Sequence, residues 1–121
     1  LRNWANCDYD DGGWRDAEAP VTQKAWGSQR ILLRRSFEIA EPSDARLRVL
    51  ARMGRGHTAK VYLNGVLVAD VVLAVNPRDY ARILLAEDAS GLLTQGKNVL
   101  AVDCRAADKG QLVDVGLEQA R

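Results

Sequence analysis

The chain has 121 residues, and its 17 Lys and Arg against 16 Asp and Glu give a formal net charge of +1. Both signs are dispersed along the chain, which argues against nucleic-acid binding because nucleic-acid binders cluster their positive charge. The length suits one domain with a single core, and no apolar run reaches the roughly 18 residues that a membrane span needs. We expect residues 1–121 to form one module excised from a larger multidomain protein, since the chain starts abruptly at Leu1.

Residues 1–30 differ from the rest of the chain. They contain all three Trp residues and five acidic side chains, but they show little alternation of apolar and polar residues. This pattern predicts one early strand over residues 4–7, followed by a long irregular segment. A loop of that length in a compact domain is usually either functional or held down by its own large side chains.

From residue 31 onward, short strands separated by turn residues dominate. Residues 31–39 and 45–53 alternate apolar and polar side chains, and in the second run Arg46, Arg48 and Arg52 occupy the polar face. Further strands are predicted over residues 59–63, 66–73, 79–86, 97–106 and 111–120, and a short helical turn or loop over residues 87–96. Short strands at intervals of about ten residues indicate an antiparallel β-sandwich or barrel.

Asn64-Gly65 stands between the strands predicted over residues 59–63 and 66–73. An Asn-Gly pair flanked by two apolar runs is the strongest short-range signal for a β-hairpin. The type I′ turn needs positive φ at both central residues, which Asn and Gly tolerate best. We therefore assign both residues to the turn and give them no role in ligand binding.

The chain has two cysteines, Cys7 and Cys104, near its opposite ends. They lack both the CxxC spacing and the neighbouring His residues of a zinc site. A disulfide remains open if the first and last strands are neighbours. Two free thiols are slightly favoured, because Cys104 lies in an apolar run and free Cys is commonly buried.

Several motifs resemble a known family in their order. Asp-Asp-Gly-Gly-Trp at residues 10–14 is followed by Trp26, by RRSFEI, and by LRVLARMGRGHTAKVYLNGVLVAD. A Tyr-containing strand, LLTQGKNVLAVDC and VDVGL complete the series. This order resembles the galactose-binding-domain-like jelly roll of the sugar-binding domains of family 2 glycoside hydrolases and related carbohydrate-binding modules.

The resemblance implies an all-β fold, an antiparallel eight-stranded jelly-roll β-sandwich. It also implies a non-catalytic, carbohydrate-binding or accessory module of a bacterial, exported glycoside hydrolase or related enzyme, located outside the cell or in the periplasm. The expected partner is a carbohydrate or the adjacent catalytic domain. The alternative is a structural or protein-interaction β-sandwich domain without sugar binding.

Catalysis within this chain is not expected. The single His, His57, lies in the turn-like sequence GRGHT, and no nucleophile motif such as GxSxG accompanies it. We therefore interpret His57 as a solvent-exposed loop residue. The carboxylates crowded into residues 8–18 are more typical of turn caps or cation ligands than of a glycosidase pair, which needs a larger cleft.

No cofactor is required by these patterns, but calcium is an alternative to turn capping for the acidic run. Asp8 and Asp10 supply hard oxygen ligands in a flexible loop, which suits Ca²⁺. Similar jelly rolls sometimes hold a structural Ca²⁺ near the termini, and by that resemblance Asp114 would contribute. Turn capping is favoured because the closing ligands of a calcium loop are absent.

Aromatic side chains are the sharper candidates for ligand binding, because sugar C–H faces pack against rings while a few polar groups recognise the hydroxyls. Trp14 and Trp26 occupy positions where similar domains bury a Trp that anchors the N-terminal segment, and a core or anchor role is favoured for each. If sugar is bound, we predict a site at the loop ends. Its predicted residues are Tyr9, Asp11, Trp26, Arg78 and Tyr80.

Overall fold

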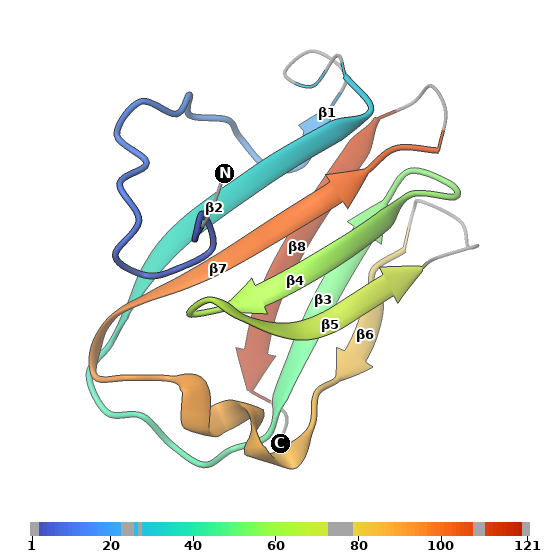
Figure 1. Ribbon diagram of the computed structural model, residues 1–121. Helices are drawn as coiled ribbons and strands as arrows, with labels where there is room; N and C mark the ends of the chain where they lie inside the picture. Colours follow the sequence, from blue (N-terminus) through green and yellow to red (C-terminus); the bar gives the residue numbers. More distant parts are fainter. Residues whose placement is uncertain (1–2, 23–25, 27, 73–78, 108–110, 120–121) are drawn as a thin grey trace.

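The computed structural model describes residues 3–22, 26, 28–72, 79–107 and 111–119, and these form two packed antiparallel sheets (Figure 1). The first sheet has the strand order β1-β8-β3-β6 and the second the order β2-β7-β4-β5. The strands are β1 (Val21–Thr22), β2 (Arg30–Ile39), β3 (Leu47–Met53), β4 (Thr58–Leu63), β5 (Val66–Val72), β6 (Ala81–Leu84), β7 (Gly96–Arg105) and β8 (Leu112–Gln119). A 3₁₀ helix, η1 (Glu87–Leu92), joins β6 to β7.

The predicted all-β, antiparallel eight-stranded sandwich is confirmed. Sequential strands alternate between the two sheets except at the β4–β5 hairpin, where both strands belong to the second sheet. No helix in the described part of the chain is long and apolar enough to span a bilayer.

One strand prediction is wrong. Residues 4–7 form turns. The Asn6 N–H donates to the Asn3 carbonyl at 3.0 Å, and the Tyr9 N–H donates to the Asn6 carbonyl at 3.2 Å. The first strand is instead the short β1, inside the segment predicted to be irregular, and it pairs with β8. The bulky residues near Trp4 pack onto the second sheet from outside rather than extending its ladder, which explains why they show no alternation.

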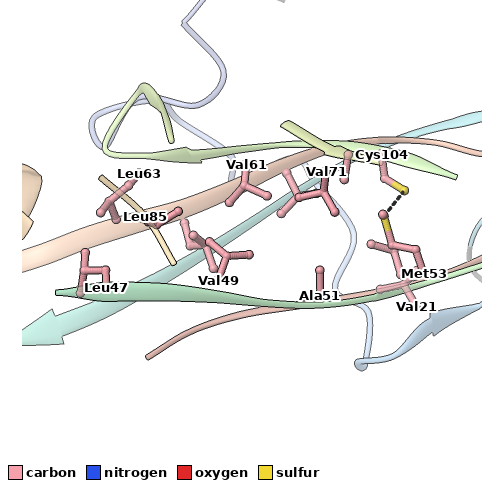
Figure 2. Close-up of a cluster of buried hydrophobic side chains, with 14 of the residues drawn as sticks. Val21, Leu47, Val49, Ala51, Met53, Val61, Leu63, Val71, Leu85 and Cys104 are labelled. Carbon is pink, nitrogen blue, oxygen red and sulfur yellow. Dashed lines mark hydrogen bonds between the residues drawn. The ribbon is translucent and has the colours of Figure 1, made fainter. Parts of the chain in front are cut away.

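The core lies between the sheets and follows the alternation of the strands. In β3 the residues at alternate positions from Leu47 to Met53 are buried, and Figure 2 shows them facing Val61, Leu63 and Val71 of the second sheet. The polar face of β3, with Arg48 and Arg52, points away from this core, as predicted. Burying each such aliphatic side chain stabilises the fold by roughly 1.5–3 kcal/mol.

β7 is the exception to alternation, because every residue from Asn98 to Cys104 is buried. Its inner side chains enter the sandwich core, whereas Val99 and Ala101 form a second apolar cluster with Ala5 on the outer face. A strand buried on both faces requires cover on both. Residues 3–18, which we call the N-terminal segment, supply that cover.

Both cysteines are free, as slightly favoured from the sequence. Cys104 is buried in the core with its Sγ 3.9 Å from Met53 Sδ (Figure 2), and burial raises the pKa of its thiol to about 12. Cys7 belongs to the outer cluster, and its thiol donates to the Lys97 carbonyl at 3.4 Å. The two thiols therefore lie on opposite faces of the second sheet.

Asn64 and Gly65 form the predicted turn, with φ values of 49° and 86°. Asn64 does more than turn the chain. Its Nδ2 donates to the Leu92 carbonyl and to Asn98 Oδ1, and its Oδ1 accepts from the Val99 N–H, each at 2.8 Å. Asn98 is fully buried and also bonds the backbone of Thr94. The turn thus joins the end of η1 to the start of β7.

The prediction of a solvent-exposed His57 is wrong. Its side chain is fully buried, its ring meets that of Trp26 edge-on with centroids 5.5 Å apart, and its Nδ1 accepts from the Ala107 N–H at 3.4 Å. GRGHT looks turn-like because Gly54 and Gly56 do form a turn, but β4 starts at once and directs the imidazole inward. Burial lowers the pKa of His57, with the backbone of Arg55 opposing the shift.

Acidic pH should destabilise the protein through His57. The unfolded chain takes up the imidazole proton near its ordinary pKa of 6.5, whereas the folded chain takes it up only at lower pH. Below that value the unfolded state binds more protons, so the free energy of unfolding falls as the pH is lowered toward the folded pKa. Urea unfolding at a series of pH values should show this slope, and His57→Phe should remove it. An unchanged slope in the variant would show that other groups cause it.

Candidate functional site

Arg34 fixes the N-terminal segment to the outer face of the second sheet. It projects from that face of β2. Its register partner on β7 is Ala101, which is in turn the register partner of Tyr62 on β4. Only 2% of its side chain is exposed. Its Nη1 donates to the Trp4 and Asn6 carbonyls at 2.5 and 2.8 Å, and its Nη2 to the Tyr9 carbonyl at 3.3 Å.

Asp11 completes the bonding of Arg34. Its Oδ2 lies 2.9 Å from Arg34 Nε, and this hydrogen bond holds the pKa of the Asp11 carboxyl below its usual value. The Asp11 side chain is half exposed, so its carboxylate is held in place yet reaches the surface. The guanidinium also lies over the Tyr9 ring, 5.3 Å from its centroid, in a cation–π arrangement.

Four aromatic residues gather on this face, and we call Trp4, Tyr9, Trp14 and Tyr62 the aromatic cluster. Trp4 and Trp14 are stacked at 20° with centroids 6.4 Å apart, while Tyr62 meets Trp4 edge-on at 5.6 Å. Tyr9 meets Trp14 edge-on at 5.9 Å. All four side chains are half-buried. The rings therefore hold one another in place while part of their surface remains open to solvent.

Charged groups border the aromatic cluster on the same face. Asp103 of β7 accepts two hydrogen bonds of 2.9 Å from the Nε and Nη2 atoms of Arg30, a bidentate pair. These hydrogen bonds to Asp103 raise the pKa of the Arg30 guanidinium. Lys60 is the register partner of Asp103, and Asp70 is the register partner of Lys60. A row of alternating charges thus crosses the sheet beside the rings.

The N-terminal segment also touches the hairpin turn. A Cβ atom added at Gly65 would lie 2.3 Å from Asn6 Oδ1, and the φ of +86° at Gly65 already disfavours any other residue. Glycine is thus needed there for two independent reasons, its backbone conformation and the close approach of Asn6. The turn at Asn64-Gly65 therefore has a role beyond the hairpin, because it is part of the surface on which the N-terminal segment packs.

The structure brings together only part of the predicted sugar site. Tyr9 and Asp11 lie beside each other around Arg34, whereas Trp26 is 2% exposed and belongs to the core. Tyr80 lies before β6 on the opposite sheet and donates a short hydrogen bond to Asp114, which raises the pKa of its hydroxyl. Arg78 lies outside the described residues.

The three residues predicted for calcium are also separated. Asp8 and Asp10 are in the N-terminal segment, while Asp114 is on β8 of the first sheet and bonds Tyr80. Asp10 caps a turn, because its Oδ1 accepts from the Gly12 N–H at 3.0 Å. Among the residues that the structure describes, no group of three His, Cys, Asp or Glu lies close enough to hold a metal ion.

Sequence reasoning missed three residues of this face, Trp4, Arg34 and Tyr62. It also left Trp14 out of the predicted site, although Trp14 belongs to the aromatic cluster. Arg34 and Tyr62 occupy the polar positions of their strands, which are normally interpreted as solvent-facing. One sequence signal did indicate that the outer face of the second sheet is buried under another part of the chain. The run NVLAVDC in β7 is apolar on both parities, which indicates a strand buried on both faces.

No protein-family model and no curated protein matches the sequence. Among solved structures, the chain is similar to a glycosyl hydrolase family 2 member from Bacteroides cellulosilyticus DSM 14838, with a TM-score of 0.64 and 15% sequence identity. The similarity covers 98% of this chain and 19% of that one. It shows a shared fold, and this chain corresponds to a small part of that protein.

Replacing Arg34 should release the N-terminal segment. We expect Arg34→Met to lower the free energy of unfolding by roughly 3 kcal/mol, because several carbonyl acceptors lose a charged donor. Arg34→Lys should recover only part of this, since an ammonium group lacks the planar fork of donors. Urea unfolding measures the change, and near-ultraviolet circular dichroism should lose intensity from the Trp4–Trp14 pair.

The matched control is Arg35→Met, because Arg35 is the next residue of β2 and its side chain is exposed. Exposed substitutions usually change stability by less than about 0.5 kcal/mol. Equal effects of the Arg34 and Arg35 variants would contradict the role assigned to Arg34.

Proposed function

We propose that this chain is a non-catalytic accessory module of a glycoside hydrolase or related carbohydrate-active enzyme, and that it binds carbohydrate at the aromatic cluster. The observation that carries the proposal is the set of four half-buried rings, locked by Arg34 and bordered by charged side chains, on one face of the sandwich. The fold shared with a glycosyl hydrolase family 2 member supports the enzymatic context. A galactose-binding-domain-like character is part of the same proposal.

The chemistry of the cluster suits a sugar. The apolar C–H face of a pyranose would stack on the exposed part of Trp14 or Trp4, whose rings are already fixed by each other and by Tyr62. Fixed rings lose little side-chain entropy on binding. The half-exposed carboxylate of Asp11 and the Arg30–Asp103 pair would bond hydroxyl groups at the border.

A structural or protein-interaction role is the second candidate, and the bonding of Arg34 favours it. In this view the rings serve only to hold the N-terminal segment over Val99 and Ala101. Both roles predict that removal of Trp14 lowers stability. Only the first predicts that it also lowers affinity for a carbohydrate under conditions where the variant remains folded.

Affinity electrophoresis of the isolated module through gels containing plant, bacterial and host polysaccharides tests the proposal. Retention by at least one polysaccharide is expected, and Trp14→Ala should weaken it about tenfold, or by about 1.4 kcal/mol, because the C–H face of the sugar loses the ring against which it packs. Thermal unfolding of the same variant shows whether it is folded at the temperature of the gel.

Tyr80→Ala is the matched control, because Tyr80 is an exposed aromatic residue on the opposite sheet. It should leave retention unchanged. No retention by any polysaccharide would refute sugar binding and leave the structural role. Loss of retention on Tyr80→Ala with none on Trp14→Ala would move the site to the first sheet.

A further inference from the structure

Asn64-Gly65 is the one Asn-Gly pair in the sequence, and such a pair has a reaction of its own. The backbone nitrogen of Gly65 attacks the side-chain carbonyl carbon of Asn64, because glycine has no side chain to crowd the approach. A bond forms between Gly65 N and Asn64 Cγ, the bond from Cγ to Nδ2 breaks, and Nδ2 leaves as ammonia with the proton of the Gly65 N–H. Water then opens the cyclic succinimide at either carbonyl, which gives aspartate or isoaspartate.

The other asparagines of the chain are poor sites for this deamidation. Each is followed either by a side chain that crowds the attack or by proline, which has no backbone N–H to react. They are Asn3, Asn6 and Asn98, followed by Trp4, Cys7 and Val99, and Asn76, followed by Pro77. In an unfolded chain, Asn64 is therefore the asparagine that reacts first.

In the folded protein, hydrogen bonds hold the Asn64 side chain in its amide form. Nδ2 donates to the Leu92 carbonyl and to Asn98 Oδ1, and Oδ1 accepts from the Val99 N–H, each at 2.8 Å. The Asn64 backbone N–H also donates to the Val99 carbonyl at 2.9 Å. Attack by Gly65 makes the planar amide carbon tetrahedral and expels Nδ2, so the reaction cannot proceed while these side-chain bonds persist.

The orientation of the Asn98 side chain is fixed from its other end. Its Nδ2 donates to the Thr94 and Gly96 carbonyls at 2.8 and 3.1 Å, and its Oδ1 accepts from the Thr94 N–H at 2.9 Å. Turning the Asn98 amide over would set donor against donor and acceptor against acceptor at all of these contacts. Asn98 therefore always presents an oxygen to Asn64, and residue 64 must supply a donor.

Deamidation removes that donor. A carboxylate at residue 64 still accepts from the Val99 N–H, but it only accepts, so the Leu92 carbonyl and Asn98 Oδ1 face a negative charge instead of an N–H. Asn98 is fully buried, and a buried acceptor that loses its partner bears the full cost of desolvation. Isoaspartate in addition lengthens the backbone by one carbon atom within a two-residue turn.

The fold nevertheless requires this reactive pair. Gly65 has a φ of +86°, and a Cβ atom there would lie 2.3 Å from Asn6 Oδ1. Asn64 has a φ of 49° and is bonded on both sides of its amide group. A substitution that prevents the reaction therefore also disturbs the turn or its hydrogen bonds to the start of β7.

We propose that Asn64 is a deamidation site that the fold keeps closed, and that its conversion after unfolding prevents return to the native state. Unfolding exposes the pair, and chemical modification of the unfolded chain then makes unfolding irreversible. The chemical lifetime of the protein thus depends on how much of its time it spends unfolded. This inference concerns the β4–β5 turn and its contacts with η1 and β7, and it does not depend on carbohydrate binding.

Parallel incubation of folded and guanidinium-unfolded protein in one mildly alkaline buffer tests the proposal. Trypsin cleaves after Lys60 and Arg78, so residues 61–78 form one peptide, in which mass spectrometry follows the replacement of the amide by a carboxyl group. Conversion should be at least about tenfold slower in the folded protein, because it first requires local opening of the turn. Residues 98–105 form the internal control peptide, and Asn98 in it should remain unconverted in both samples.

Refolding of the same unfolded samples tests the consequence. Portions withdrawn at successive times are diluted out of denaturant, and the recovered near-ultraviolet circular dichroism gives the native fraction. This fraction should fall in step with conversion at Asn64.

The variant Asn64→Asp builds one product of the reaction directly. Its melting temperature should be lower by roughly 5–10 °C, because two acceptors lose their donor. Asn3→Asp is the matched control, since Asn3 also has a positive φ, 58°, but its side chain is exposed. It should melt at the wild-type temperature. The time courses use the wild-type protein, so they decide the question even if Asn64→Asp does not fold.

Equal rates of conversion in the folded and unfolded samples would overturn the proposal, because the hydrogen bonds would then give no protection. Absence of conversion in the unfolded sample would also overturn it, as would full recovery of native signal from converted protein. Recovery that falls while Asn64 remains intact would assign the loss to aggregation and contradict the role of deamidation.

Discussion

The buried guanidinium of Arg34 is the contact on which the outer face of the second sheet depends. A charged group with 2% of its side chain exposed is stable only when its donors are paired, and here the acceptors are carbonyls of Trp4, Asn6 and Tyr9 and the carboxylate of Asp11. These acceptors all belong to the N-terminal segment. The segment and the arginine therefore satisfy each other, and neither has this geometry alone.

This mutual dependence explains how an irregular segment can present an ordered aromatic surface. The rings of Trp4 and Trp14 are not held by regular secondary structure but by residues whose backbone is fixed by Arg34 and by turns. Asn6 of the same segment also lies against Gly65 in the turn between β4 and β5. The Asn64 side chain connects that turn to Asn98 and to the end of η1 by hydrogen bonds. The motifs LNG and GKN, far apart in sequence, thus meet in one hydrogen-bond network that supports the surface.

The strands from residue 30 onward could be predicted from the sequence, because alternation with a period of two reports directly which face of a strand is buried. Residues 4–7 could not, since large side chains without alternation fit a strand or a packed loop equally well. His57 was misplaced for a related reason. A turn sequence shows where the chain reverses, but the direction of its last side chain depends on the strand that follows.

The candidate site could be predicted only in part. Tyr9 and Asp11 were identified from their residue types in a long loop, and their proximity to each other follows from short sequence separation. Their partner Arg34 follows 23 residues after Asp11 and occupies a position that alternation marks as solvent-facing. The separation of Tyr80 from them is a property of the sheet order, which local sequence does not contain.

The three Trp side chains offer the most direct test of the central claim, that the aromatic cluster on the second sheet is the carbohydrate-binding surface. Each indole N–H gives one signal in a two-dimensional ¹H–¹⁵N NMR spectrum, and single Trp→Phe variants assign them. During titration with a retained oligosaccharide, the signals of Trp4 and Trp14 should shift, while that of the buried Trp26 should stay in place. Three unmoved indole signals, with shifts confined to residues around Tyr80, would contradict the account.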